Sequence, residues 1–145
     1  MSTKVSEVLR RKGPVVWTTT PETTVFEAIG IMAEHGIGAL AVTESGRLVG
    51  VLSERDYTRK VALKDRSSKQ TRVDEIMTRS VITVSPHSEV AECLRKMANN
   101  GIRHLPVVDG EQLLGMISSK DVMRCIISEQ DQLIQHLESY IAGVA

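Results

Sequence analysis

The seven residues Gly50-Val-Leu-Ser-Glu-Arg-Asp56 return later in the chain as Gly115-Met-Ile-Ser-Ser-Lys-Asp121. In each stretch a glycine-led apolar run precedes the pattern Ser-x-x-Asp. This order is typical of a buried strand that leads into a helix, because the serine oxygen can accept a free amide of the first helical turn and the acid can reach back. The stretches start 65 residues apart (115 − 50), which indicates a duplicated unit of that size.

The duplication extends well beyond these motifs. At a spacing of 65, 16 of the 44 positions from Val16 to Arg59 are identical to their counterparts, where ordinary composition gives roughly three. Upstream, Val5-Ser-Glu-Val-Leu9 resembles Val73-Asp-Glu-Ile-Met77, with a three-residue difference in the connection that follows. We predict two repeats, residues 1–65 and 66–145, the second ending in an amphipathic helix.

Each repeat has the same predicted elements, in the order β-α-β-β-α after a short apolar helix. Thr23 or Ser88 caps the longer helix of its repeat, and Gly36 or Gly101 ends it. The fold class is therefore α/β (α+β). The expected segments are short helices at Val5–Arg11 and Val73–Met77, β-rich stretches at Val15–Thr19 and Val81–Val84, and hairpins that join Leu40–Val42 to Leu48–Leu52 and Leu105–Val108 to Leu113–Ile117.

A single repeat of this length would be only marginally stable, because small domains bury too little of their surface. We therefore expect the two repeats to pack through their sheets as one pseudo-symmetric body. The polar segment Lys64–Arg72 is predicted to be a mobile linker between them.

Composition excludes several classes of protein. Eighteen basic residues balance eighteen acidic ones, so the basic excess of a general nucleic-acid binder is missing. The sequence contains neither a membrane span nor a signal peptide. The two cysteines fit neither a disulfide framework nor a zinc cluster. A cytoplasmic protein is the expectation.

The two Ser-x-x-Asp motifs are the best candidates for chemistry. The alternative explanation is helix capping alone. In the functional interpretation, the helix N-terminus attracts phosphate, while Asp56 or Asp121 accepts the hydroxyls of a ribose. Arg55 or Lys120 would then neutralise phosphate charge. The two roles are compatible, since serine can cap the helix while aspartate binds a ligand.

The other motifs in the sequence give weaker evidence of function. Gly36-Ile-Gly-Ala-Leu-Ala41 matches a dinucleotide-binding pattern, but it follows a helix and precedes a strand, which is the wrong context. The four histidines lack metal-ligand spacing, so no metal site is predicted. No nucleophile has an evident base, so no catalytic residue is assigned. His104, beside Arg103, is either a structural histidine or a phosphate contact, and Trp17 either packs or stacks on a base.

The duplicated pattern of helix, Gly-Ile-x-x-Leu, hairpin and Ser-x-x-Asp resembles the cystathionine β-synthase (CBS) domain. Two copies in tandem are similar to a CBS pair, or Bateman module, and the match covers Val5 to about Ile127. The resemblance implies a stand-alone regulatory module with two clefts between the repeats. The implied ligands contain adenosine: AMP, ADP, ATP, NAD(H) or S-adenosylmethionine.

The resemblance also assigns residues to each cleft. The first would use Ser53, Arg55 and Asp56 with Thr78, Val81, Ile82, Ile102, Arg103 and His104. The second would use Ser118, Lys120 and Asp121 with Lys12, Val16, Trp17, Ile37, Gly38 and Ala39. Because Ala39 replaces His104 and Leu9-Arg10 replaces Met77-Thr78 between the copies, the clefts are expected to differ in size and charge.

The sequence therefore favours an adenine-nucleotide sensor without catalytic activity or a catalytic cofactor. It would form a homodimer and pass ligand binding to a regulated protein partner, with no role for nucleic acid or membrane. The alternatives are a structural protein-interaction module with empty clefts and a nucleotide-consuming enzyme. The latter needs a general base or metal that the sequence does not supply.

Overall fold

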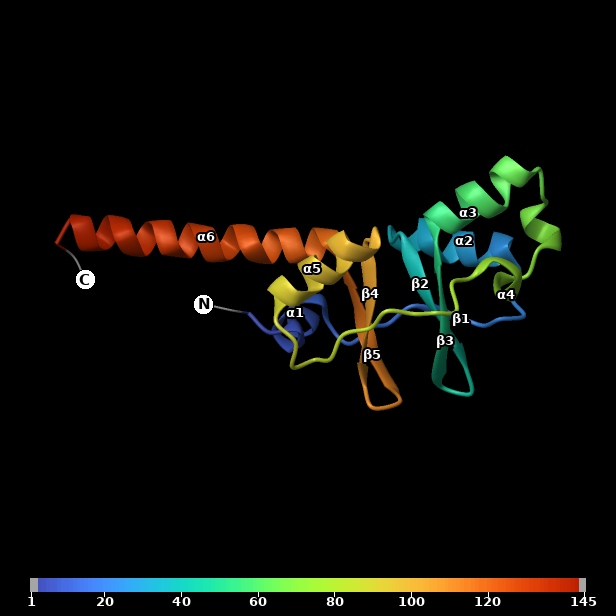
Figure 1. The fold of residues 1–145 in the computed structure, drawn as a ribbon, viewed down its shortest axis with the longest axis horizontal. Coiled ribbons are helices and arrows are strands. Elements are labelled where there is room, and N and C mark those ends of the chain that lie inside the picture. The colour runs from blue at the N-terminus through green and yellow to red at the C-terminus, as the bar shows by residue number, and fades with distance from the viewer. Residues whose placement is uncertain (1–2, 144–145) are drawn as a thin grey trace.

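The computed structural model describes residues 3–143 and contains two repeats with small sheets (Figure 1). The first repeat and its connections contain α1 (Val5–Lys12), β1 (Thr18–Thr19), α2 (Val25–His35), β2 (Ala39–Glu44), β3 (Arg47–Ser53), α3 (Glu54–Lys60), η1 (Ala62–Lys64) and η2 (Ser68–Gln70). The second contains α4 (Val73–Ile76), α5 (Val90–Asn100), β4 (His104–Asp109), β5 (Gln112–Ser118) and α6 (Ser119–Ile141).

The two hairpins confirm the predicted duplication. β2 pairs with β3 in antiparallel register, with Leu40 opposite Leu52, and β4 pairs with β5 in the equivalent register, with Leu105 opposite Ile117. All four of these leucine and isoleucine side chains are fully buried. In Figure 1 the hairpins stand side by side between the helices of the two repeats. The predicted packing of two small sheets is thus confirmed.

The segments before the helices form less strand than predicted. In the first repeat only Thr18–Thr19 pairs, in parallel with Ala41 and Val42 of β2. The prediction of a strand over Val81–Val84 is wrong, because there only Val84 makes an isolated bridge, to Val107. Val81, Ile82 and Thr83 lie in no strand, and the Thr83 carbonyl accepts a hydrogen bond from Lys96 Nζ at 2.9 Å.

Each of the two short helices, α1 and α4, packs into the core of the other repeat. Val5 and Val8 of α1 are buried in the cluster built around Leu105 and Ile117 of the second repeat. Val73 and Ile76 of α4 belong instead to the cluster of the first repeat. Each core therefore includes a helix that precedes the other repeat's strands in sequence. Both cores thus contain residues from either side of the predicted boundary at residue 65.

The helix caps differ by one residue from the prediction. Thr24, not Thr23, caps α2 through a hydrogen bond from the Glu27 amide. Glu89 is the N-cap of α5, where no side-chain cap forms, and Ser88 instead accepts the Ser85 amide. The C-terminal prediction is confirmed: Gly36 and Gly101 both have φ 61°, in the left-handed region that favours glycine.

The expected linker at residues 64–72 is packed against the first repeat. It contains η2, and Thr71 is buried with its hydroxyl bound to the Ser67 carbonyl. The Thr71 carbonyl accepts the Val25 amide at 2.8 Å. This segment is thus fixed at its C-terminal end, contrary to the prediction of a mobile connection. Within residues 3–143, no helix is both long and apolar enough to cross a membrane.

Candidate functional site

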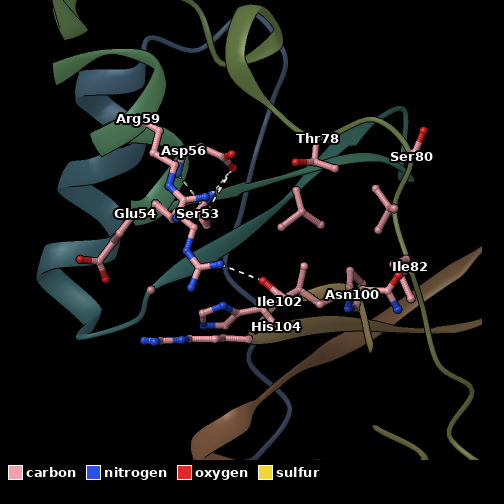
Figure 2. Close-up of a pocket in the computed structure, with 17 residues that line it drawn as sticks. Ser53, Glu54, Asp56, Arg59, Thr78, Ser80, Ile82, Asn100, Ile102 and His104 are labelled. Atoms are coloured by element: carbon pink, nitrogen blue, oxygen red, sulfur yellow. Dashed lines mark hydrogen bonds between the residues drawn. The ribbon is translucent and has the colours of Figure 1, made fainter. Parts of the chain in front are cut away.

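A cavity of about 590 Å³ lies between the repeats, beside the start of α3. Figure 2 shows three groups of side chains around it, from α3, from the segment after α4, and from the start of β4. All nine residues that the sequence assigned to the first cleft line this cavity. Its lining consists of Gly38, Val51, Ser53, Glu54, Arg55, Asp56, Arg59, Thr78, Ser80, Val81, Ile82, Asn100, Gly101, Ile102, Arg103, His104 and Pro106.

Ser53 and Asp56 close a reciprocal cap at the start of α3. The Asp56 amide donates to Ser53 Oγ at 3.2 Å, and the Ser53 amide donates to Asp56 Oδ2 at 2.9 Å. The Ser53 hydroxyl also reaches Oδ2, at 3.1 Å, while Lys60 Nζ lies 3.1 Å from Oδ1. In the functional interpretation of the sequence, this carboxylate accepts the hydroxyls of a ribose. In the structure it is held by the helix, with the cavity directly beside it.

The opposite wall is a segment without regular structure that begins where α4 ends and bends at Arg79 and Ser80. Met77 leaves the helix in an extended conformation, and Thr78 exchanges two backbone hydrogen bonds with Val51, at 2.9 and 3.0 Å. This approach requires glycine at position 50, since a Cβ there would lie 2.6 Å from the Met77 sulfur. The backbone contact between Thr78 and Val51 holds this segment beside the cavity, and Thr78, Ser80 and Ile82 line the wall (Figure 2).

Positive charge predominates on the cavity wall. Arg55, Arg59 and Arg103 face Glu54 and Asp56, and Lys60 already pairs with Asp56. Arg55 also donates to the Gly101 carbonyl at 2.8 Å, which ties α3 to the end of α5 in the other repeat. Guanidinium groups bind phosphate through paired hydrogen bonds. The wall can therefore hold an anionic group that is attached to a larger molecule.

His104 lies where the cavity approaches the second Ser-x-x-Asp motif. Burial lowers the pKa of this imidazole, and the positive charges of Lys12, Arg103 and Arg55 lower it further, against the opposing effect of Asp121. His104 is therefore neutral at pH 7. It therefore lines the cavity as an uncharged hydrogen-bonding group and adds no positive charge to the arginines and Lys60.

The second motif has the same cap but a different neighbour. Asp121 and Ser118 form the reciprocal cap of α6, with the Ser118 amide 2.8 Å from Asp121 Oδ2. Lys12 Nζ donates to that same oxygen at 2.9 Å and to the Met116 carbonyl at 2.8 Å. Burial raises the pKa of Asp121, but the Lys12 and Ser118 hydrogen bonds outweigh it, so the net pKa is below its usual range. This acid is not free either.

The local backbone explains why a lysine is found there. Residues 51 and 116 are counterparts in the repeat, and the carbonyl of each needs a donor. In the first repeat the extended Thr78 backbone supplies that donor, because α4 stops at Ile76. In the second, α1 continues to Lys12, and the ammonium group replaces the backbone amide at Met116. The extra helical turn is the three-residue difference seen in the sequence.

The other residues assigned to the second cleft are dispersed. Gly38 lines the first cavity instead, where a Cβ would lie 3.1 Å from a Glu54 oxygen and 3.3 Å from the His104 ring. Ala39 is buried in β2, and Ile37 packs on the first core. Trp17 is 42% exposed and stacks on His35, with ring centroids 3.5 Å apart. Val16 is half-buried and Lys120 is exposed.

A smaller cavity of about 260 Å³ lies at the hairpin turns. It is lined by residues such as Arg47, Thr83 and Glu111, and it includes none of the residues assigned to either cleft. Among residues 3–143, no three His, Cys, Asp or Glu side chains gather as metal ligands would.

Several residues of the main cavity were not assigned from the sequence. Arg59 could have been found, because it lies three residues after Asp56 on a helix and so shares its face. Ser80 follows Thr78 through a bend, so strand periodicity could not have placed it at the cavity. Glu54, Asn100 and Gly101 gave no such signal, since their positions depend on how the two repeats meet.

Comparison with known proteins identifies the family. The CBS-domain profile matches residues 5–63 and 73–128. The chain is 40% identical over 152 aligned residues to the mitochondrial CBS domain-containing protein CBSX3 of Arabidopsis thaliana, covering 98% of this chain and 73% of that protein. A CBS-domain protein from Burkholderia ambifaria has a similar structure, with a TM-score of 0.84, 44% identity, and coverage of 88% of this chain and 96% of that one.

A second similar structure was solved with ligands. It is the CBS domain pair of protein MJ0100 in complex with 5′-methylthioadenosine and S-adenosyl-L-methionine. Its TM-score is 0.77, with 27% identity and coverage of 89% of this chain and 99% of that chain. The repeated motifs, the paired hairpins and these matches agree, and the chain therefore belongs to the CBS-domain family as a tandem pair of CBS domains.

Proposed function

We propose that this protein is a regulatory module without catalytic activity, whose first cleft binds an adenosine-containing ligand that carries phosphate. The observation that supports this most strongly is the composition of the 590 Å³ cavity. It combines a helix-borne aspartate with three arginines, and both repeats contribute to its walls. A cavity of this size is within the range of small-molecule sites.

Asp56 is the proposed ribose contact. A carboxylate offers about four acceptor positions, and Asp56 uses three in the contacts to the Ser53 amide, the Ser53 hydroxyl and Lys60. One position remains for a ribose hydroxyl. A second becomes available when the Ser53 hydroxyl turns toward the ligand, which leaves the helix capped by the two backbone contacts.

The arginines favour ligands with phosphate. Arg55, Arg59 and Arg103 attract the anionic groups of AMP, ADP, ATP or NAD(H), whereas the sulfonium of S-adenosylmethionine is repelled. The ligands in the MJ0100 complex support an adenosine moiety, and the charge of this cavity supports the phosphate. Phosphate-bearing adenosine compounds are therefore proposed to bind more tightly here than uncharged or cationic ones.

The second cleft is proposed to bind more weakly. The Lys12 ammonium group holds both Asp121 Oδ2 and the Met116 carbonyl, so a ligand that approaches either of these oxygens must displace it. Breaking those two contacts reduces the net free energy of binding. Ligand binding to wild-type protein should therefore approach one equivalent per chain.

Ligand binding would act through the contact between repeats. Arg55 of the first repeat bonds Gly101 of the second at the cavity edge, so a phosphate that recruits Arg55 competes with that link. The ligand can shift the arrangement of the repeats only by its differential affinity for the two states. The change would be passed to a regulated protein partner. The expected cytoplasmic location stays a prediction, since a relative is mitochondrial.

Calorimetric titration with AMP, ADP, ATP, NAD, adenosine and S-adenosylmethionine tests the ligand class. We expect saturable binding of the phosphate-bearing compounds, with adenosine weaker. A ligand that binds the folded state alone must also raise the melting temperature. Absence of both heat and melting shift for every compound at millimolar concentration would contradict the proposal.

One observation favours a second function, a protein-interaction module with empty clefts. Both Ser-x-x-Asp motifs complete helix caps, so capping alone accounts for their presence. Turnover of a titrated nucleotide by the purified protein would instead indicate an enzyme. The titrations above separate all three possibilities.

A further inference from the structure

The C-terminal half of α6 has no partner in the described chain. Every residue from 130 to 143 is exposed, and the helix runs on past α1 and α5 (Figure 1). The CBS-domain match ends at residue 128, so this half lies outside the repeat. A helix that protrudes in this way gains little from its own propensity and is normally stabilised by packing of an apolar face.

The exposed half carries such a face. Apolar residues recur at alternating spacings of four and three, which is the a/d pattern of a coiled coil and is interrupted only by Gln130. Ile134 is 52% exposed and Ile141 84% exposed, so the face is open to solvent. We call it the α6 stripe, and it consists of Met123, Ile127, Gln130, Ile134, Leu137 and Ile141.

The two borders of the α6 stripe differ in chemistry. One border repeats every seven residues as Ile126, Leu133 and Tyr140, and is apolar. The other repeats as Arg124, Asp131 and Glu138, and is charged. In the described part of the chain, neither Arg124 nor Glu138 forms an ion pair.

The charges argue against a lipid surface as the occupant. Helices that lie on anionic membranes carry Lys and Arg on their polar face. Between Arg124 and Ala145 the sequence has no Lys or Arg, while it has the acids Glu129, Asp131 and Glu138. An anionic surface would repel this helix.

We propose that the α6 stripe packs antiparallel against the α6 stripe of a second copy of this chain, centred near residue 132. In that arrangement the a positions of one helix face the d positions of the other, where Ile127, Ile134 and Ile141 are a and Met123, Gln130 and Leu137 are d. The apolar border of one helix then faces the apolar border of the other, and the charged border faces the charged border. Ile127 meets Leu137 of the other copy, and Leu133 meets Leu133. Arg124 meets Glu138 of the other copy twice, once at each end, which forms two ion pairs that the single chain lacks.

A parallel pairing is less favourable for this sequence. It would set the apolar border of one helix against the charged border of the other, so that Leu133 faces Glu138 and Ile126 faces Asp131. Arg124 and Glu138 would lie 14 residues apart (138 − 124), which is about 21 Å along a helix and too far to pair. In the antiparallel form Asp131 meets its own counterpart, a like-charge contact that solvent screens.

The stripe is tested with Ile134→Asp and the matched control Gln132→Asp, which places the same charge on the opposite face. Light scattering after gel filtration measures the mass of the full chain, and a melting curve checks that each variant folds. We expect about 32 kDa for wild type and Gln132→Asp, twice the 16.0 kDa chain, and half of that for Ile134→Asp. A wild-type mass of one chain, or any mass that Ile134→Asp leaves unchanged, overturns the proposal.

The direction of pairing is tested by exchanging charges. Arg124→Glu sets like charges together at both ends and should weaken the dimer, and Arg124→Glu combined with Glu138→Arg should restore it. A parallel dimer gives no such rescue, because the two positions do not meet. Failure of the double variant to recover the wild-type dissociation constant overturns the antiparallel arrangement.

Discussion

The two Ser-x-x-Asp motifs have the same sequence pattern and the same helix cap, yet only Asp56 lies beside a 590 Å³ cavity of the kind expected. Asp121 lies under the ammonium group of Lys12. The difference arises outside the motifs, in how far the preceding short helix continues. α4 stops at Ile76 and leaves a wall without regular structure, whereas α1 continues to Lys12. A repeated motif therefore does not guarantee a repeated site.

The largest expected effect comes from removing the lysine. Lys12→Met keeps the length of the side chain without its charge, so Asp121 and the Met116 carbonyl lose their shared donor. We predict that nucleotide binding rises from about one toward two equivalents per chain, measured by calorimetry. Lys4→Met is the matched control, because Lys4 forms a surface ion pair with Glu89, at 3.6 Å. Unchanged stoichiometry in Lys12→Met would contradict the proposal that this lysine weakens binding at the second cleft.

A smaller effect is expected from the cavity arginines. Arg59→Gln removes a guanidinium from the wall while keeping a polar side chain. The affinity for ADP should fall about tenfold, the loss of one charge-assisted hydrogen bond, and the affinity for adenosine should not change. Arg95→Gln, on the exposed side of α5, is the control. Equal losses for ADP and adenosine would mean that Arg59 does not contact phosphate.

The smallest effect is on stability and its pH dependence. The folded pKa of Asp121 is lowered, so its contribution to stability is fully present above its ordinary value of 3.8 and is lost as the pH falls through the folded pKa. At pH 7 wild type should exceed Lys12→Met by about 1 kcal/mol in free energy of unfolding, since the lysine is partly exposed. Urea titrations should show this difference shrinking as the pH falls below 3.8 and through the folded pKa. A difference that grows in acid would contradict the ion pair.

Local patterns were sufficient to predict the duplication, the hairpins and the helix caps formed by the two Ser-x-x-Asp motifs. Ser53 and Asp56 are positioned by their own helix cap. The 65-residue spacing identifies their counterparts in the second copy, Ser118 and Asp121. Thr78 and His104 could be assigned to the cleft because the family resemblance supplied the arrangement of the repeats. Without that resemblance, nothing in the sequence brings these residues together.

The features that were missed depend on contacts between distant residues. Lys12 was assigned to a binding site, but its role at Asp121 depends on a contact across 109 positions. The apolar faces of Val5–Val8 and Val73–Ile76 predicted burial without indicating which core each helix joins. Gly38 and its counterpart Arg103 both line the first cavity. The sequence analysis assigned one of them to each cleft and so did not predict that they would lie in the same one.

The most direct test compares the two aspartates in matched variants. Asp56→Asn and Asp121→Asn each keep an oxygen that can accept the cap amide while removing the charge, so both helices remain capped. Calorimetric titration with ADP should show that Asp56→Asn loses the single strong binding event and that Asp121→Asn keeps it at wild-type affinity. The reverse result, with strong binding lost in Asp121→Asn and retained in Asp56→Asn, would contradict the account.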